Sequence, residues 1–164
     1  MIKLSPFLII FLFLFSFPLS TFPQSGKVPP FQMVLSNGKI FKAENIPFSK
    51  PIIIIYFSPE CDDCQILMEE ILRMKNSLQK ASIVMITFLP IQSVKQFVLK
   101  YHLDDFSFLF VGTEGEAFFI KDYYRIEDFP YIVLYNQFGD LLKVYKKYKK
   151  DNTLLDLTNS LNYM

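Results

Sequence analysis

The chain is poor in the residues that build metal centres and disulfide scaffolds. Its 164 residues include no tryptophan, one histidine and two cysteines. Two cysteines cannot form the several bridges of a disulfide-dense domain. A zinc site takes about four protein ligands, and an iron–sulfur cluster needs more cysteines than this chain has. With His102 as the lone histidine, we expect no metal centre and no bound cofactor.

The chain also lacks an excess of charge of either sign, with 17 basic and 16 acidic residues and a formal net charge of +1. Nucleic-acid-binding proteins usually carry a basic excess, so we expect no nucleic-acid partner. Disorder is excluded because 51% of the residues are hydrophobic and 17% are aromatic, which is enough to build a buried core. The length suits one domain of about 100–150 residues.

Much of the apolar content lies in residues 1–25, where Lys3 is the only charge. An unbroken apolar run over residues 7–15 is followed by small and helix-breaking residues. These features are typical of a secretory signal peptide, and the run is well short of the about 20 residues that span a bilayer. We therefore expect a signal peptide over residues 1–25, cleaved between residues 20 and 26, and export to the periplasm or cell envelope. A membrane contact would then exist only if this segment is retained as an anchor.

The mature domain, residues 26–164, has the pattern of an α/β protein. Residues 51–57 form a largely β-branched run, which is typical of a strand buried on both faces of a sheet. Apolar residues recur at helical spacing between residues 62 and 80, and a second buried strand follows at 82–88. This order predicts a βαβ unit with two parallel strands. The helical pattern places four polar residues on the exposed face: Glu69, Glu70, Arg73 and Asn76.

Turn signals and further patterns predict the remaining elements. Asn37-Gly38 predicts a type I′ turn between strands over 31–35 and 39–42. Residues 131–135 and 140–145 predict an antiparallel pair of strands, because only a short loop separates them. The other expected elements are a helix after Pro90, a short strand over 106–111, and helices over 114–124 and 153–161.

Both cysteines lie in one C-x-x-C motif, Cys61-Asp62-Asp63-Cys64, at the junction of the buried strand and the helix. The first cysteine falls at a helix N-terminus, where free N–H groups and the helix dipole favour a thiolate. The second lies one turn inward, close enough to attack a mixed disulfide formed by the first. The motif therefore predicts reversible dithiol–disulfide exchange. A static structural disulfide is the alternative, although a bridge that closes so short a loop adds little stability.

Residues 54–64 (IIYFSPECDDC) resemble the active-site strand and helix start of the thioredoxin superfamily, and most of all its exported TlpA/ResA-like, redoxin-type branch. Three further stretches agree with this resemblance: residues 31–42, 82–111 and 124–139. The resemblance extends from residue 28 to the C-terminus. It implies a three-layer α/β fold in which helices flank a central mixed sheet, with an extra N-terminal β-hairpin.

The resemblance also implies roles for individual residues. Cys61 would attack a substrate disulfide, and Cys64 would resolve the mixed disulfide and leave a Cys61–Cys64 disulfide. Pro130 would follow a cis peptide bond and face the cysteines, with Phe129 beside the bound substrate. The implied partners are protein thiols and disulfides as substrates and a membrane-bound thiol reductase as electron donor.

The chain departs from the family around the motif. No tryptophan precedes it, residues 52–55 are wholly apolar, and Leu67 stands where some members of the branch have a carboxylate. The sequence therefore offers no candidate for the group that deprotonates Cys64. Asp62 and Asp63 oppose a thiolate on Cys61, which would favour the oxidised pair and make the reduced protein a reductant. Helix capping is the alternative role of these two carboxylates.

Two other functions fit parts of the pattern. A redoxin-type thiol peroxidase has a similar fold, but Ser58 and Ile54 stand where such enzymes place threonine and proline. A binding or interaction module that keeps the fold without catalysis is the second alternative.

A basic run, KVYKKYKK, covers residues 143–150. Lysines along a strand edge discourage edge-to-edge pairing, which explains the run without a binding role. Contact with nucleic acid or anionic lipid is a weaker alternative, given the neutral overall charge. Docking of a redox partner is a further one.

Overall fold

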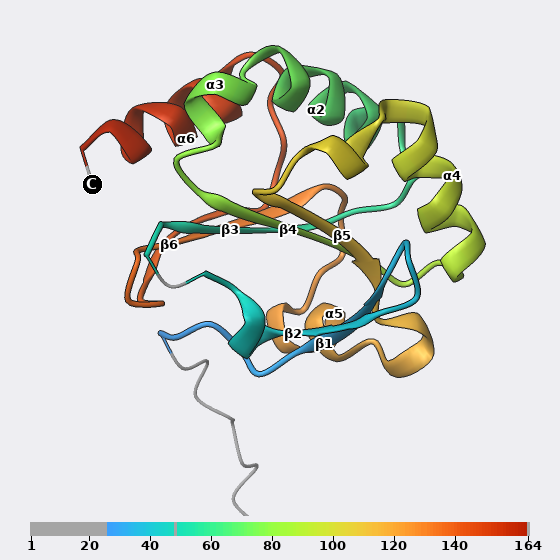
Figure 1. Cartoon of the computed structure of the whole chain (residues 1–164). Helices are drawn as coiled ribbons and strands as arrows, with labels where there is room; N and C mark the ends of the chain where they lie inside the picture. Colours follow the sequence, from blue (N-terminus) through green and yellow to red (C-terminus); the bar gives the residue numbers. More distant parts are fainter. Residues whose placement is uncertain (1–25, 48, 164) are drawn as a thin grey trace, which may run out of the picture.

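The computed structural model of the chain describes residues 26–47 and 49–163, so the predicted signal peptide lies outside the described residues. The described part contains a seven-stranded sheet in the order β2-β1-β5-β4-β3-β6-β7 (Figure 1). Its strands are β1 (Gln32–Leu35), β2 (Ile40–Lys42), β3 (Ile52–Tyr56), β4 (Ser82–Thr87), β5 (Leu109–Thr113), β6 (Tyr131–Tyr135) and β7 (Leu141–Tyr145).

The helices follow the strands as an α/β protein requires. They are α2 (Asp62–Arg73), α3 (Lys75–Leu78), α4 (Ile91–Tyr101), α5 (Phe119–Tyr124) and α6 (Asn152–Asn162). Short 3-10 turns cover Ala43–Asn45, Leu103–Asp105 and Gly115–Ala117. Within residues 26–47 and 49–163, no helix has the length and apolar character needed to cross a membrane.

The centre of the sheet is parallel and its flanks are antiparallel. β3 pairs in parallel with β4, and β4 pairs in parallel with β5. β6 runs antiparallel to β3 and β7 antiparallel to β6, while β1 runs antiparallel to β5. The predicted βαβ unit, the predicted final strand pair and the expected central mixed sheet are all confirmed.

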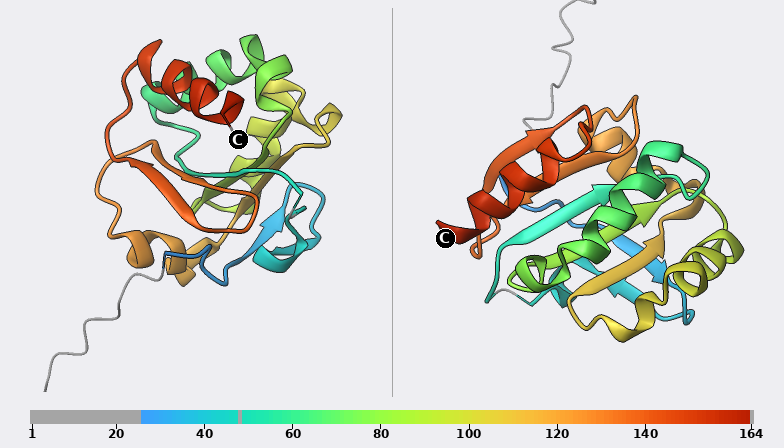
Figure 2. Two further views of the ribbon diagram at one scale, coloured as in Figure 1. Left: turned by 90° about the vertical axis from the view of Figure 1, so that its left-hand side faces the viewer. Right: turned by 90° about the horizontal axis from the view of Figure 1, so that it is seen from above.

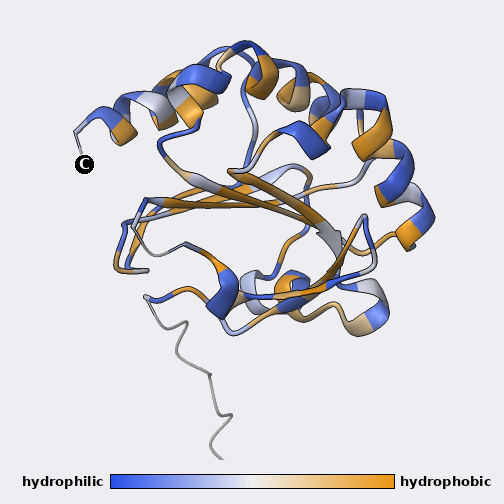
Figure 3. Cartoon of the chain, in the orientation of Figure 1, coloured by the Kyte–Doolittle hydropathy of each residue, from blue (hydrophilic) through white to orange (hydrophobic). Residues whose placement is uncertain are grey.

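Alternate residues of β3 face two different layers, because successive side chains of a strand point to opposite faces. Ile53 and Ile55 pack with α2, α4 and α6, whereas Ile52 and Ile54 pack with α5 and the N-terminal hairpin. Figure 2 shows the helices of the first layer lying across one face of the sheet. Figure 3 shows the apolar strands between this layer and the layer of α5 and the N-terminal hairpin. Burial of each isoleucine side chain stabilises the fold by about 1.5–3 kcal/mol, which explains why this run forms the central strand.

The helix expected over residues 62–80 is interrupted at Met74. α2 ends at Arg73, Met74 adopts φ −99° and ψ 14°, and α3 follows as a separate turn. The prediction that Glu70 faces solvent is wrong, because this side chain is buried and only 2% exposed. It accepts hydrogen bonds from the Tyr148 hydroxyl and the Asp151 backbone N–H. These partners are far away in sequence, so helical periodicity does not reveal them.

The N-terminal hairpin is present, but its turn is not the predicted type I′ turn. Gly38 has φ 81°, whereas Asn37 does not take the positive φ that this turn type requires. The loop instead spans residues 36–38. Its backbone bonds run from Leu35 N–H to Lys39 O at 2.9 Å and from Gly38 N–H to Leu35 O at 2.8 Å.

Two elements after β4 also differ from the prediction. β5 begins at Leu109 rather than at residue 106, and Phe106 and Phe108 pack edge to face before it. The helix expected over 114–124 is divided into the turn Gly115–Ala117 and α5, because Phe118 between them has φ 48°. A left-handed residue cannot continue a right-handed helix. The spacing of the aromatic residues does not predict this break.

Candidate active site

Cys61 lies at the N-terminus of α2, immediately after the loop that follows β3. The loop is held by its own hydrogen bonds, from Cys61 N–H to Ser58 O at 3.1 Å and from Glu60 N–H to Ser58 Oγ at 3.3 Å. Cys61 is the N-cap residue, and its Sγ accepts from Cys64 N–H at 3.4 Å. The sulfur thus occupies the position of a capping oxygen, where a negative charge is stabilised.

Cys64 lies one turn further along α2 and differs from Cys61 in exposure. Its side chain is completely buried in the apolar layer between the sheet and the helices, whereas Cys61 is half-buried. Burial raises the pKa of the Cys64 thiol well above its usual range, and its hydrogen bond with Cys61 adds to the rise. Both cysteines are free thiols in the structure, so the expected Cys61–Cys64 disulfide is not formed in it.

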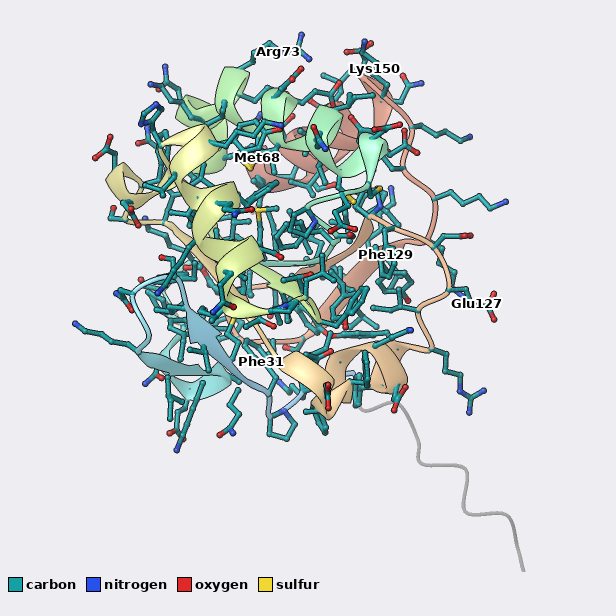
Figure 4. All side chains as sticks on the ribbon, turned by 90° about the vertical axis from the view of Figure 1, so that its right-hand side faces the viewer. Phe31, Met68, Arg73, Glu127, Phe129 and Lys150 are labelled. Carbon is teal, nitrogen blue, oxygen red and sulfur yellow. The ribbon has the colours of Figure 1, made fainter. Side chains whose placement is uncertain are left out.

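The loop before β6 contacts Cys61. The Phe129–Pro130 peptide bond is cis, as the resemblance implies. The Cys61 thiol donates to the Phe129 carbonyl oxygen at 3.7 Å, so the structure brings Phe129 and Cys61 together. Figure 4 shows Phe129 close to Glu127 of the same loop. Pro130 is buried next to it, at the start of β6.

Several aromatic rings that the sequence pattern does not mark as site residues gather beside Phe129. The Phe129 ring lies 5.8 Å from the Tyr56 ring and 5.9 Å from the Phe88 ring, measured between centroids. Phe118 lies 5.9 Å from Phe88, and the Lys121 ammonium lies over both of these rings at 5.3 Å and 5.7 Å. Phe88 and Phe118 follow β4 and β5. The sequence does contain a signal for these two residues. The carboxyl ends of parallel strands meet at one edge of a sheet, so residues that follow β4 and β5 are expected near Cys61, which follows β3.

The Glu114 carboxylate binds Tyr56 of this aromatic cluster. The Tyr56 hydroxyl donates to Glu114 Oε1 at 2.6 Å, and the backbone N–H of Ile120 donates to Glu114 Oε2 at 2.8 Å. Burial raises the pKa of Tyr56, and its bond to the Glu114 carboxylate raises it further. Glu114 therefore fixes both Tyr56 and the start of α5 next to Phe129.

Asp62 and Asp63 occupy the exposed first turn of α2, beside Cys61. Carboxylates are favourable there because they interact with the positive end of the helix dipole. Residues 52–55 and Leu67 are buried and apolar, as the sequence implies. The buried carboxylate of the same helix, Glu70, is bound to Tyr148 and Asp151.

Gln65 stabilises the loop that carries Cys61. Its side-chain amide donates to Pro59 O at 3.1 Å, and its Oε1 accepts from Lys100 Nζ at 2.9 Å. His102 lies exposed at the end of α4. Among residues 26–47 and 49–163, no group of three or more histidine, cysteine, aspartate or glutamate side chains is arranged to hold a metal ion.

No family model and no curated protein sequence matches the chain. Solved structures do resemble it. One is a secreted disulfide oxidoreductase of Mycobacterium tuberculosis homologous to Escherichia coli DsbE, with a TM-score of 0.67 and 16% identity over 82% of this chain and 96% of that one. The exposed lipoprotein thioredoxin of Streptococcus pneumoniae has a TM-score of 0.60 and 14% identity over 81% of this chain and 100% of that one. The peroxidoxin BcpB of Mycobacterium tuberculosis has a TM-score of 0.71 and 11% identity over 84% of this chain and 95% of that one. These likenesses show that the chain has the thioredoxin fold.

Proposed function

We propose that the chain is an exported thiol–disulfide oxidoreductase that reduces disulfides of other proteins. The observation that carries this proposal is the asymmetry of the pair: Cys61 is half-exposed at a helix N-terminus, and Cys64 is buried three residues later. An accessible thiol can meet a substrate, and a shielded thiol can react only with its neighbour. The predicted signal peptide supports export.

The reaction begins at the Cys61 sulfur. Its thiolate attacks one sulfur of the substrate disulfide, so that a bond forms between Cys61 and the substrate while the second substrate sulfur leaves and takes up a proton. Cys64 then loses its proton and attacks Cys61 Sγ. This step forms the Cys61–Cys64 disulfide and releases the first substrate sulfur as a thiol. The substrate gains two electrons and two protons, and the protein pair loses them.

Phe129 and the cis peptide bond before Pro130 lie where the substrate must approach Cys61. We propose that this segment binds the incoming chain and that the rings of Phe88 and Phe118 contact its apolar side chains. The oxidised pair then needs a thiol reductase, which we propose is a membrane-bound protein with its own reactive dithiol. Asp62 and Asp63 would bias the pair toward its oxidised form and so make the reduced protein a stronger reductant.

A thiol peroxidase would need a cation beside the reacting cysteine. Arg73 is one of the chain's two arginines, and it pairs with Glu70 at 3.5 Å and Asp151 at 4.0 Å. The other, Arg125, is exposed after α5. The oxidoreductase fits the site better than the peroxidase.

Trapping tests the proposed function. A Cys64→Ala variant incubated with two peptides joined by one disulfide should accumulate a covalent adduct through Cys61, because the freed peptide diffuses away and the variant has no second thiol to resolve the adduct. The wild type should release reduced peptide and form its own disulfide, and Cys61→Ala should do neither. Mass spectrometry distinguishes the three results. A Cys64→Ala variant that forms no adduct would instead support a binding module without catalysis.

The direction of electron flow has a separate test. If Asp62 and Asp63 make the protein a reductant, its potential should lie nearer the about −270 mV of thioredoxin than the about −120 mV of DsbA. Equilibration with glutathione buffers of known ratio measures this potential. A value close to that of DsbA would contradict the reductant role and leave the exchange reaction intact.

A further inference from the structure

A lysine-rich segment borders the candidate active site. We call residues 146–150 the lysine strap. They contain Lys146, Lys147, Lys149 and Lys150 around Tyr148 and connect β7 with α6. In the β6–β7 ladder Tyr145 pairs with Ile132. The strap therefore starts at the sheet end where Pro130 precedes β6, next to the loop that contacts Cys61.

The catalytic helix itself holds the strap in place. Glu70 of α2, only 2% exposed, accepts from the Tyr148 hydroxyl at 2.5 Å and from Asp151 N–H at 2.9 Å. The Lys149 backbone N–H donates to Thr153 Oγ1 at 2.9 Å. Burial and Glu70 raise the pKa of Tyr148, and the charge of Asp63 adds to the rise. The strap is thus fixed within electrostatic reach of the C-x-x-C motif.

The lysines of the strap carry charge that the described protein does not neutralise. All four are exposed, and none forms an ion pair with a residue of the described ranges. Lys143 differs, since it lies on β7 and pairs with Asp156 at 2.6 Å. Protection of a strand edge accounts for Lys143 but not for the strap, which lies beyond the last residue of β7.

Carboxylates near the thiols do not neutralise the strap either. Glu60, Asp62 and Asp63 lie around Cys61, and Glu127 and Asp128 precede Phe129, yet none pairs with a strap lysine in the described structure. In the view of Figure 4, Phe129 lies between Lys150 and Glu127. A partner that reaches Cys61 therefore meets carboxylates beside the thiol and positive charge farther out, along the strap.

We propose that the lysine strap docks an acidic segment of the protein with which Cys61 exchanges its disulfide. This inference rests on the proposed function and names the partner's chemistry: carboxylates that flank its reactive cysteines at the distance of the strap from Cys61. Oppositely charged surfaces guide association and fix the orientation of the two proteins. An anionic bilayer fits less well, because a membrane on the strap would cover the neighbouring Cys61.

Two disulfide peptides test the proposal with the full chain in its reduced form. They share one disulfide and differ only in flanking residues, glutamates in one and lysines in the other. Each rate is divided by the rate of the same peptide with dithiothreitol, whose reactive form carries no charge besides its thiolate, to remove differences in intrinsic reactivity. We expect the wild type to favour the acidic peptide about tenfold at low salt, within the range of electrostatic steering. The preference should disappear at high salt, where surface charges are screened.

Charge-neutral variants locate the effect. A variant with Lys146, Lys147, Lys149 and Lys150 changed to glutamine should lose the preference for the acidic peptide. A control variant with Lys39→Gln and Lys95→Gln, two exposed lysines on other elements, should keep it. Equal rates for both peptides in the wild type, or a preference that survives in the strap variant, would overturn the docking proposal and leave the proposed function standing.

Vesicles of phosphatidylglycerol separate the membrane alternative. Strap-dependent vesicle binding without a peptide preference would assign the strap to lipid and overturn the docking proposal. If the wild type reduces neither peptide, the proposed function itself fails.

Discussion

Cys61 and Cys64 belong to one turn of α2, yet the protein surrounds their sulfurs differently. The Cys61 sulfur takes a capping position between the Cys64 N–H and the Phe129 carbonyl. The Cys64 sulfur lies within the apolar layer, where ionisation is disfavoured. Residues 52–55 and Leu67 are apolar, so shielding is the main influence on Cys64 that the structure provides.

This difference predicts the order in which the two thiols react. With iodoacetamide at neutral pH, Cys61 of the reduced native protein should be alkylated and Cys64 should stay unmodified, because burial keeps Cys64 inaccessible and its raised pKa keeps it protonated. Peptide mapping by mass spectrometry gives the two rates. The chain unfolded in urea is the control, since both thiols should then react alike. Equal labelling of the two cysteines in the native protein would contradict the assignment of Cys61 as the attacking thiol.

At the scale of elements, α2 is joined to the β7–α6 connection by one buried carboxylate. Replacing Glu70 with alanine removes the acceptor of the Tyr148 hydroxyl and the Asp151 N–H. We expect this change to lower the free energy of unfolding by about 2–3 kcal/mol, because donors to a charged group lose their partner. Urea denaturation measures the change.

Glu69→Ala is the matched control for this prediction. Glu69 lies next to Glu70 on the same helix but is exposed, so its replacement should change the free energy of unfolding by less than about 0.5 kcal/mol. If the two variants lose the same small amount, the connection between Glu70 and the strap contributes little to stability.

The sequence predicts best those elements whose residue pattern matches the faces that they bury. The isoleucine run of β3, the helix after Pro90 and the final strand pair all occur where expected, because burial on one or both faces determines their residue types. Helical periodicity places Glu70 on the wrong face, because its partners lie about eighty residues away in sequence.

The candidate site is predictable from the sequence only in part. The C-x-x-C motif at a strand–helix junction, and the approach of Phe129 to it, follow from local pattern and resemblance. The support of Tyr56 by Glu114 and the stacking of Phe88 on Phe129 depend on how separate strands are brought together. The break at Phe118 depends on a single left-handed residue that carries no sequence signal.

At the scale of the whole molecule, Cys61 and Gly26, the first described residue, lie near opposite ends of the β6–β7 pair. The Gly26 carbonyl accepts from Leu141 N–H at the start of β7, whereas Cys61 meets the residue before Pro130 at the start of β6. These two points lie at opposite ends of the antiparallel β6–β7 pair, because Leu141 pairs with Tyr135 at the end of β6. A partner can therefore reach the thiols and the lysine strap from the side remote from Gly26.

Buried tyrosines determine how the whole fold responds to alkali. Burial is the leading cause that raises the pKa of Tyr124 and Tyr131, and it raises the pKa of Tyr135 to about 12. The folded chain thus keeps protons that the unfolded chain releases near pH 10, so stability is fully present below about pH 10 and is lost as the pH rises through the folded pKa values. We expect the urea midpoint to fall steeply between pH 10 and about 12, with phenolate absorbance at 295 nm appearing together with loss of the far-ultraviolet signal. Complete ionisation of the tyrosines near pH 10 in a protein that stays folded would show that these hydroxyls are not sealed in the core.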